Sequence, residues 1–457
     1  MKHPFLFIVL IVLSGCATYH AQPIAPAALM DAFEARTLDS PNLQRYLAAH
    51  CGNSSACTPG VWNLNTLTLA AFYFSPVLDT ARATQSTSEA AIQSAGRRPN
   101  PTLQIPLGYT SNAKAGESPY TFGLGLDIPL ETAGKRGYRM VQAQQMSNAA
   151  RFTIGNVAWQ VRSRLRSHML NFYAAIHRAQ ILEQQITTQQ QIVAMLDKRL
   201  ALGAASAPEA NQAHITLTWN RIDLAHAQQQ CQDERAQIAS TIGLPVDVLA
   251  SIPISFETFE QVYPAIPADE VRRQAILNRA DVLAALAEYE ASQAALQLEI
   301  ARQYPDIHIG PGYTFDAGAH KFLLPLSGMI LPLFNQNQGP IAEADAHRRE
   351  VAARVNALQA QAIGDTQRTV QNYRATLANL HLAESLLSAQ LRQLHDFQKS
   401  FQAGETDRLT LALAQHAFYT HVLIRQDALV QVQRNIGQLE DAMQRPLSAS
   451  DFPAISE

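Results

Sequence analysis

The sequence predicts a mainly α-helical protein made of two copies of one unit, each with a pair of β-strands long enough to cross a bilayer. Three observations lead to this fold class: an internal duplication, two very long helical runs, and alternating segments bounded by proline and glycine. The chain has 457 residues, 47% of them hydrophobic and only 16% charged, with a formal net charge of −3. This composition excludes a disordered chain, and without a basic excess no nucleic-acid partner is expected.

The N-terminus predicts export from the cytoplasm. Residues 5–13 form an apolar run that is too short to span a bilayer but typical of the core of a signal peptide. Leu13-Ser14-Gly15-Cys16 follows and resembles the bacterial lipoprotein box, which implies acylation of Cys16, whereas an ordinary cleavage site beside a coincidental cysteine is the alternative. We expect a lipoprotein signal peptide over residues 1–15 and a lipidated linker with a short helix over residues 16–61. The residue after the cysteine is alanine rather than aspartate, which favours anchoring in the outer membrane.

Three further cysteines bear on the redox compartment. Cys51 and Cys57 bracket a short polar loop, and an exported protein meets oxidising conditions, so a local disulfide is expected, with two free thiols as the alternative. Cys231 lies in a helical stretch without a partner in sequence, and we interpret it as a small packing residue.

An internal repeat with an offset of about 200 residues organises the chain. Three landmarks recur in the same order: Arg98-Pro99-Asn100-Pro101 with Gln303-Tyr304-Pro305-Asp306, Ile128-Pro129-Leu130 with Leu331-Pro332-Leu333, and Leu202-Gly203 with Ala403-Gly404. The first unit is expected over residues 62–250, the second over 251–445, and a C-terminal tail over 446–457. In each unit, the expected order of elements is a helix, two strands, a long helix, a glycine turn and a second helix.

Four strands follow from alternation between proline and glycine boundaries. They are expected over residues 102–110, 120–130, 306–315 and 321–333. Each has about the length of a tilted strand that crosses a bilayer, and Leu124, Leu126 and Ile128 would share a lipid-facing side. The alternative is a pair of hairpins packed on a helical body in water.

The helices are far longer than those of globular proteins. Residues 135–202 and 341–403 are each interrupted only by single glycines, so the expected length is roughly 100 Å. Apolar residues keep the spacing of coiled coils at Leu429, Val432, Ile436 and Leu439, and again at Val351, Val355 and Leu358. One helical hairpin could not bury this surface alone, so antiparallel partner helices are implied.

Closure of a membrane sheet requires more than one chain. Four strands leave open edges in lipid, and about eight is the smallest number that closes around side chains. Two chains would give eight strands and a filled barrel, whereas three chains would give twelve strands and an opening. A homotrimer is therefore favoured for a conduit.

Together, the lipoprotein box, the duplicated helix and hairpin units, the Pro-Asn-Pro boundary and the glycine turns resemble TolC-type outer-membrane efflux factors. The phrases Pro129-Leu130-Glu131-Thr132-Ala133-Gly134-Lys135-Arg136 and Leu331-Pro332-Leu333-Phe334-Asn335-Gln336-Asn337-Gln338-Gly339-Pro340 are most similar to the CzcC-like heavy-metal branch. The resemblance implies a trimer with a 12-stranded barrel in the outer membrane and an α-helical barrel across the periplasm. It also implies a periplasmic adaptor, an inner-membrane pump of the RND type, and passive conduction of substrates, with heavy-metal cations first among them.

The resemblance assigns Leu202, Gly203, Ala403 and Gly404 to the periplasmic tip that receives the adaptor. Acidic rings that narrow the mouth in some family members are not reproduced at Thr410 and Leu413. The candidates for pore lining are then Glu209, Glu405 and Asp407, with exposed turn charges that have no role as the alternative.

Other functional classes find little support. The sequence has no Gly-x-Ser-x-Gly elbow, no His-Glu-x-x-His helix and no phosphate loop, so neither an enzyme nor a cofactor beyond the lipid on Cys16 is expected. Glu343, Asp345 and His347 are close in sequence but are interpreted as surface charge, and no metal site is assigned. The alternatives are a multidrug-efflux or type I secretion duct with the same architecture, and a lipid-anchored coiled-coil protein without a pore.

Overall fold

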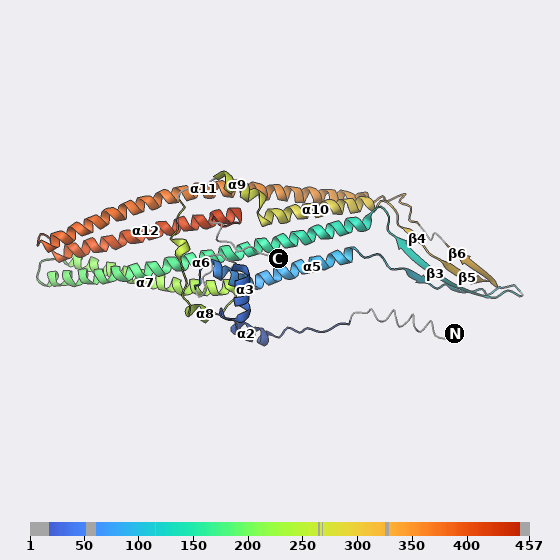
Figure 1. The fold of residues 1–457 in the computed structure, drawn as a ribbon, viewed down its shortest axis with the longest axis horizontal. Helices are drawn as coiled ribbons and strands as arrows, with labels where there is room; N and C mark the ends of the chain where they lie inside the picture. Colours follow the sequence, from blue (N-terminus) through green and yellow to red (C-terminus); the bar gives the residue numbers. More distant parts are fainter. Residues whose placement is uncertain are drawn as a thin grey trace.

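The molecule is elongated, with a small β-sheet at one end and two helical turns at the other (Figure 1). The computed structural model describes residues 18–51, 61–114, 116–263, 266, 268–324 and 329–447. Four helices form the body: α6 (Lys135–Ala201), α7 (Ala207–Ile242), α11 (Gln338–Gln402) and α12 (Arg408–Met443). The two long helices, of 67 and 65 residues, confirm the two predicted runs to within three residues at each end.

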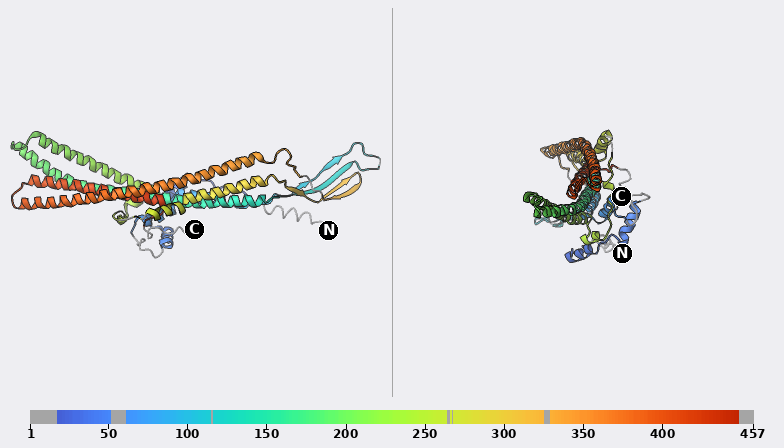
Figure 2. Two further views of the ribbon diagram at one scale, coloured as in Figure 1. Left: turned by 90° about the horizontal axis from the view of Figure 1, so that it is seen from above. Right: turned by 90° about the vertical axis from the view of Figure 1, so that its left-hand side faces the viewer.

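These four helices form one curved layer. α6 packs against α7 and α12, and α12 packs against α11, so the order across the layer is α7, α6, α12, α11. The end-on view in Figure 2 shows the two helical hairpins side by side in an arc. The layer therefore ends in α7 on one side and α11 on the other.

Two shorter helices widen the layer beside the sheet. α5 (Pro76–Ala95) packs on α6, and α10 (Ala280–Ala301) packs between α6 and α11. They precede the strands of the first and second unit respectively, which is the order that the duplication predicts. A short helix, α9 (Ala268–Leu277), lies on α11 near the middle of the molecule.

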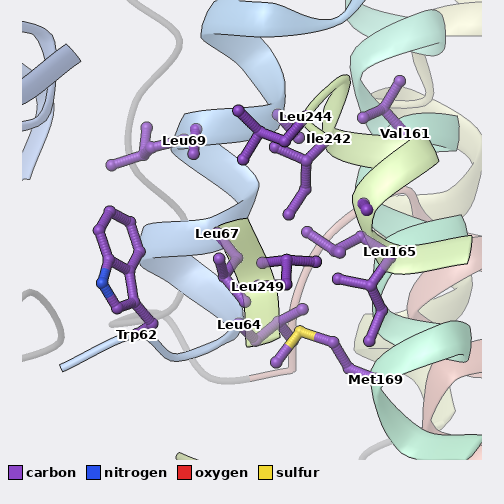
Figure 3. Close-up of a cluster of buried hydrophobic side chains, with 14 of the residues drawn as sticks. Trp62, Leu64, Leu67, Leu69, Val161, Leu165, Met169, Ile242, Leu244 and Leu249 are labelled. Atoms are coloured by element: carbon purple, nitrogen blue, oxygen red, sulfur yellow. The ribbon is translucent and has the colours of Figure 1, made fainter. Parts of the chain in front are cut away.

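The main hydrophobic core lies at mid-length, where the N-terminal segment and the connection between the units meet α6. The short elements that contribute to it are α3 (Pro41–Cys51), α4 (Leu64–Phe74), α8 (Val246–Ala250) and a 3₁₀ turn (Glu257–Phe259). The helix α2 (Pro26–Glu34) precedes them and has no buried residue. Leu67 of α4 and Leu165 of α6 are both fully buried there, beside Leu249 of α8 (Figure 3). The N-terminal segment has two helices, α2 and α3, where the sequence predicted one.

Within the described residues, six strands form one antiparallel sheet. They are β1 (Thr102–Gln104), β2 (Leu107–Tyr109), β3 (Tyr120–Leu130), β4 (Ile307–Ile309), β5 (Gly312–Asp316) and β6 (Ala319–Leu323). β3 pairs with β1 and β2 on one side and with β4 and β5 on the other, and β6 pairs with β5. β1 and β2 together form one interrupted strand, and so do β4 and β5, so the six segments correspond to the four predicted strands. The second predicted strand, β3, is confirmed with its bounds.

Two predicted strands are interrupted by proline. The first breaks at Pro106 and the third at Pro311, because proline has no N–H to donate to the ladder. Their carbonyls still accept from β3: the N–H of Gly123 lies 2.8 Å from the oxygen of Pro106, and that of Leu126 lies 3.0 Å from the oxygen of Pro311. Each interrupted strand therefore remains hydrogen-bonded to β3 at its break.

The prediction for the fourth strand, residues 321–333, was wrong in its second half. β6 begins two residues earlier and ends at Leu323, and the described residues 324 and 329–333 are not in a strand. β6 is the edge of the sheet among the described residues, and Pro332 has no N–H to donate to a ladder.

The coiled-coil spacing is confirmed for α12, where Leu429, Val432, Ile436 and Leu439 are all buried. On α11, Val351 and Val355 are buried while Leu358 is half-buried. Among the described residues, no helix combines the length and the apolar character that crossing a membrane requires.

Candidate functional site

One face of the sheet is apolar and exposed. Alternation along β3 puts Leu124 and Leu126 on this face, and antiparallel pairing places Tyr313 opposite Leu124 and Leu103 opposite Leu126. Rings gather toward the end farthest from the helices, where the centroids of Tyr109 and Tyr120 lie 5.4 Å apart. Leu124 is 47% exposed in the single chain although it is surrounded by apolar neighbours. An exposed apolar face with aromatic residues at its rim is typical of strands in contact with lipid.

The opposite face is polar and rich in glycine. Its paired residues are Thr102, Gln104, Gly108, Thr121, Gly123, Gly125, Asp127, Pro129, His308, Gly312, Thr314, Asp316, Ala319, Lys321 and Leu323. Near the helices, Nδ1 of His308 lies 3.1 Å from both carboxylate oxygens of Asp127. Near the far end, Nζ of Lys321 donates to Asp316 at 3.2 Å. The sheet therefore has two unlike faces, one apolar and one polar and rich in glycine.

A polar network fixes the sheet to the helices. Nζ of Lys135, in the first turn of α6, donates to the carboxylate of Asp306 and to the carbonyl of Tyr304, each at 2.7 Å. The hydroxyl of Thr132 donates to the carbonyl of Pro305 at 2.6 Å. A cavity of about 610 Å³ opens beside these residues at the junction. The strands of the two units are thus locked together where they join the long helices.

At the other end of the molecule, the two glycine turns have the same geometry. Gly203 and Gly404 have φ angles of +69° and +79°, which favour glycine because a Cβ would be strained there. After α6, the N–H of Ala204 reaches the carbonyl of Arg199 at 2.7 Å, and after α11 the N–H of Glu405 reaches that of Ser400 at 2.8 Å. Both helices therefore end in a Schellman motif. Figure 1 places both turns at the same end, as the duplication predicts.

Leu202, Gly203, Ala403 and Gly404 are all exposed, and Leu202 is 83% exposed. A Cβ built on either glycine would meet nothing within 4 Å. The structure therefore brings these four predicted residues together as an accessible surface. Their role as an adaptor site stays a prediction.

Two acidic residues near the turns take part in capping the N-termini of α7 and α12. Glu209 forms a capping box with Ser206 at the start of α7, and these hydrogen bonds lower the pKa of Glu209. Asp407 caps α12 and forms an ion pair with Arg199 of α6 at 2.5 Å, which lowers its pKa to about 2. Glu405 is exposed on its turn. Two of the three candidate pore residues thus hold the tip in shape, and their contact with a pore stays a prediction.

A buried charge network in the middle of the molecule was missed by the sequence analysis. Arg162 and Arg166 of α6 both approach Oε2 of Glu440 on α12, at 3.0 and 3.3 Å, and the three side chains are at most 7% exposed. Nε1 of Trp159 donates to Asp441 at 2.9 Å. Burial lowers the pKa of Arg166 and raises that of Asp441. The signal in the sequence was the pair of arginines four residues apart between the apolar residues Val161, Leu165 and Met169.

Several predicted features lie outside the described residues. These are the signal peptide, Cys16, Cys57 with the side chain of Cys51, and residues 448–457. Cys231 is half-buried, with a free thiol. Asp345 and His347 pair with Arg348 and Glu350 on their own helix. Within the described residues, no group of three or more His, Cys, Asp or Glu side chains is placed to hold a metal ion.

Comparison with known proteins agrees with this geometry. Residues 73–244 match the family model of outer membrane efflux proteins. The chain is 24% identical over 348 residues to the cobalt-zinc-cadmium resistance protein CzcC of Cupriavidus metallidurans, covering 75% of this chain and 80% of the relative. It is also 24% identical over 454 residues to the pyoverdine export outer membrane protein OpmQ of Pseudomonas aeruginosa, covering 92% of each.

Solved structures share the fold. The outer membrane protein VceC of Vibrio cholerae matches with a TM-score of 0.68 at 19% identity, over 89% of this chain and 98% of that one. CusC matches with a TM-score of 0.65 at 17% identity, over 86% of this chain and 97% of that one. The CusC structure is described in connection with the formation of a transmembrane channel. The similarity to outer membrane efflux proteins thus covers residues 73–244, and the fold is that of the solved structures of VceC and CusC.

Proposed function

We propose that three copies of the chain form one continuous duct, with a 12-stranded barrel in the outer membrane and an α-helical barrel that extends into the periplasm. The duct passively conducts substrates that a periplasmic adaptor and an inner-membrane RND pump deliver. The observation that carries this proposal is the sheet with one apolar and one polar face and unpaired strands at both edges. An open edge is not tolerated in lipid, and neighbouring copies supply the missing partners.

The helical layer supports the same assembly. Its outermost helices in the half that ends in the turns, α7 and α11, carry exposed apolar side chains. Trp219 and Ile215 of α7 are 62% and 50% exposed, and Leu382 of α11 is 69% exposed. Such surfaces on both edges of an arc are typical of subunit interfaces. We infer that α7 of one copy packs against α11 of the next until three arcs close.

Heavy-metal cations are the proposed substrates, on the basis of the similarity to CzcC. A second candidate is an organic substrate, because the similarity to OpmQ has the same identity and covers more of the chain. A duct of this kind takes its specificity largely from the pump. Growth of a deletion strain on Co²⁺, Zn²⁺ or Cd²⁺, with and without the complementing chain, separates the two candidates.

The purified protein is expected to migrate as a heat-sensitive trimer and to form conducting pores in a planar bilayer, because the polar face then encloses water. The mass of the detergent complex and single-channel recording measure both properties. A monomer without conductance would support the alternative of a lipid-anchored coiled-coil protein without a pore.

Anchoring by a lipid on Cys16 is part of the proposal. It rests on the lipoprotein box alone, and the mass of the mature N-terminal peptide tests it. An unmodified Cys16, or cleavage elsewhere, would contradict it. The local disulfide between Cys51 and Cys57 stays a prediction of the same kind.

We expect the double variant Gly203→Trp, Gly404→Trp to lose export while the trimer persists. Each indole would project into open space, so the fold bears only the left-handed strain of about 1 to 2 kcal/mol per site. The adaptor would meet a bulky ring in place of a bare turn. Export assays and trimer abundance in membranes measure the two effects separately.

The matched control is Gly203→Asn, Gly404→Asn, since asparagine accepts the left-handed conformation without a large side chain. It should keep most of the export. Wild-type export by the tryptophan variant at normal abundance would contradict docking at the turns.

A further inference from the structure

The helix α2 has an apolar face that stays exposed among the described residues. Leu29, Met30 and Phe33 are 60%, 58% and 39% exposed, and no residue of α2 is buried. Leu29 and Met30 lie four and three residues before Phe33, so the three side chains share one face. Asp31 and Glu34 lie beside this face, and neither forms an ion pair with another described residue. α2 therefore combines exposed apolar area with two negative charges.

α2 is attached to the α7 edge of the helical layer. Arg36, just after α2, donates from Nη1 to the carbonyl of Gly243 at the end of α7, at 2.8 Å. Its guanidinium also lies 5.4 Å from the centre of the Phe33 ring. Figure 1 shows α2 at mid-length, on the side of the layer opposite α9. The exposed face is thus held beside the end of α7.

α9 occupies the α11 edge of the same layer. Val271 of α9 belongs to a buried cluster with Val370 of α11 and Met443 of α12. At about 1.5 Å per residue, Val370 lies roughly 50 Å from the end of α11 at its glycine turn. α7 has 36 residues and begins just after the other turn, so its end, beside α2, lies at about the same height. When the arcs close as proposed, α2 of one copy comes next to α9 of the following copy.

The outer face of α9 offers an apolar hollow and a positive charge. Asp269, Arg272, Arg273, Ile276 and Leu277 line a surface hollow of about 310 Å³ there. Leu277 is 60% exposed. Arg272 is exposed and forms no ion pair with another described residue, so its charge is available to a partner. This surface complements the apolar and acidic side of α2.

We propose that α2 of each copy packs its apolar face on α9 of the next copy, so that three such contacts join the trimer at mid-length. Leu29 and Met30 then cover Leu277, while Asp31 and Glu34 approach Arg272. The partner is a second copy of this chain, because the two surfaces lie on opposite edges of one arc at the same height. Unlike surfaces that meet head to tail close into a ring when the rotation between copies allows it. The inference rests on the proposed trimer and adds a contact to it.

The test is chemical cross-linking of the assembled trimer. Leu29→Cys and Met30→Cys are each combined with Leu277→Cys and treated with a short bismaleimide in membranes. We expect covalent dimers and trimers that survive heating in SDS, because the two thiols lie on neighbouring copies. The wild type and the three single variants are the controls, which also account for the free thiol of Cys231, and they should run as monomers after heating.

Charge reversal in the same cross-linking variants gives a second measure. Arg272→Glu should lower the yield of covalent species by up to about fivefold, the effect of losing an exposed ion pair. Adding Asp31→Lys and Glu34→Lys should restore the yield, because the charges are then exchanged. A heat-sensitive trimer without covalent products in both double-cysteine variants would overturn the contact between α2 and α9 while leaving the duct intact. Absence of any trimer in the untreated wild type would instead overturn the proposed function.

Discussion

Arginine in place of Leu124 is expected to remove most of the assembled trimer. Leu124 lies on the apolar face at the middle of β3, opposite Tyr313. A guanidinium at the bilayer midplane costs about 2 to 4 kcal/mol, and each trimer would carry three of them. The heat-sensitive trimer band from purified outer membranes measures the loss.

Thr314→Arg is the control for this variant. Thr314 pairs with Gly123, one residue from Leu124 along β3 but on the polar face. Its arginine would meet lumen water, so assembly should persist. Equal trimer yields from the two variants would contradict the placement of the sheet in the membrane.

Loss of the buried carboxylate at Glu440 is expected to destabilise the helical body by about 3 to 5 kcal/mol. In Glu440→Gln, Arg162 and Arg166 would lose their shared acidic partner at a site where water does not reach them. Denaturant unfolding in detergent, followed by helical circular dichroism, measures the change in unfolding free energy.

Asp427→Asn is a matched comparison between the same two helices. Its pair with Arg178 spans 3.3 Å, but the two side chains are 64% and 37% exposed. An exposed pair contributes about 1 kcal/mol or less. If the two variants lost the same stability, burial would not be what makes the Glu440 network important.

Local signals were enough to predict the architecture. The helix ends after α6 and α11 follow from glycine at the C′ position, and β3 follows from strict alternation between Tyr120 and Leu130. The duplication predicts that both turns lie at the same end of the molecule, and they do. These features depend on residues that are close in sequence.

Features that depend on distant residues were not predictable in the same way. Arg162 and Glu440 are 278 positions apart, and a charge on a helix face gives no sign of its partner. β6 has only β5 as a ladder partner among the described residues, and the local sequence does not show where pairing at such an edge stops. The charge of Asp407 made it a candidate for lining the pore. In the structure it caps the N-terminus of α12 and forms an ion pair with Arg199 of α6, which depends on how the two hairpins meet.

The glycines on the polar face of the sheet limit where the proposed duct can be shut. Gly123 and Gly125 on β3, with Gly108 and Gly312 beside them, present backbone rather than side chains. At these four positions no side chain has a rotamer that could swing into the proposed passage. We therefore expect a closing movement in the helices rather than at these glycines, as far as the turns at Gly203 and Gly404, about 100 Å away along α6.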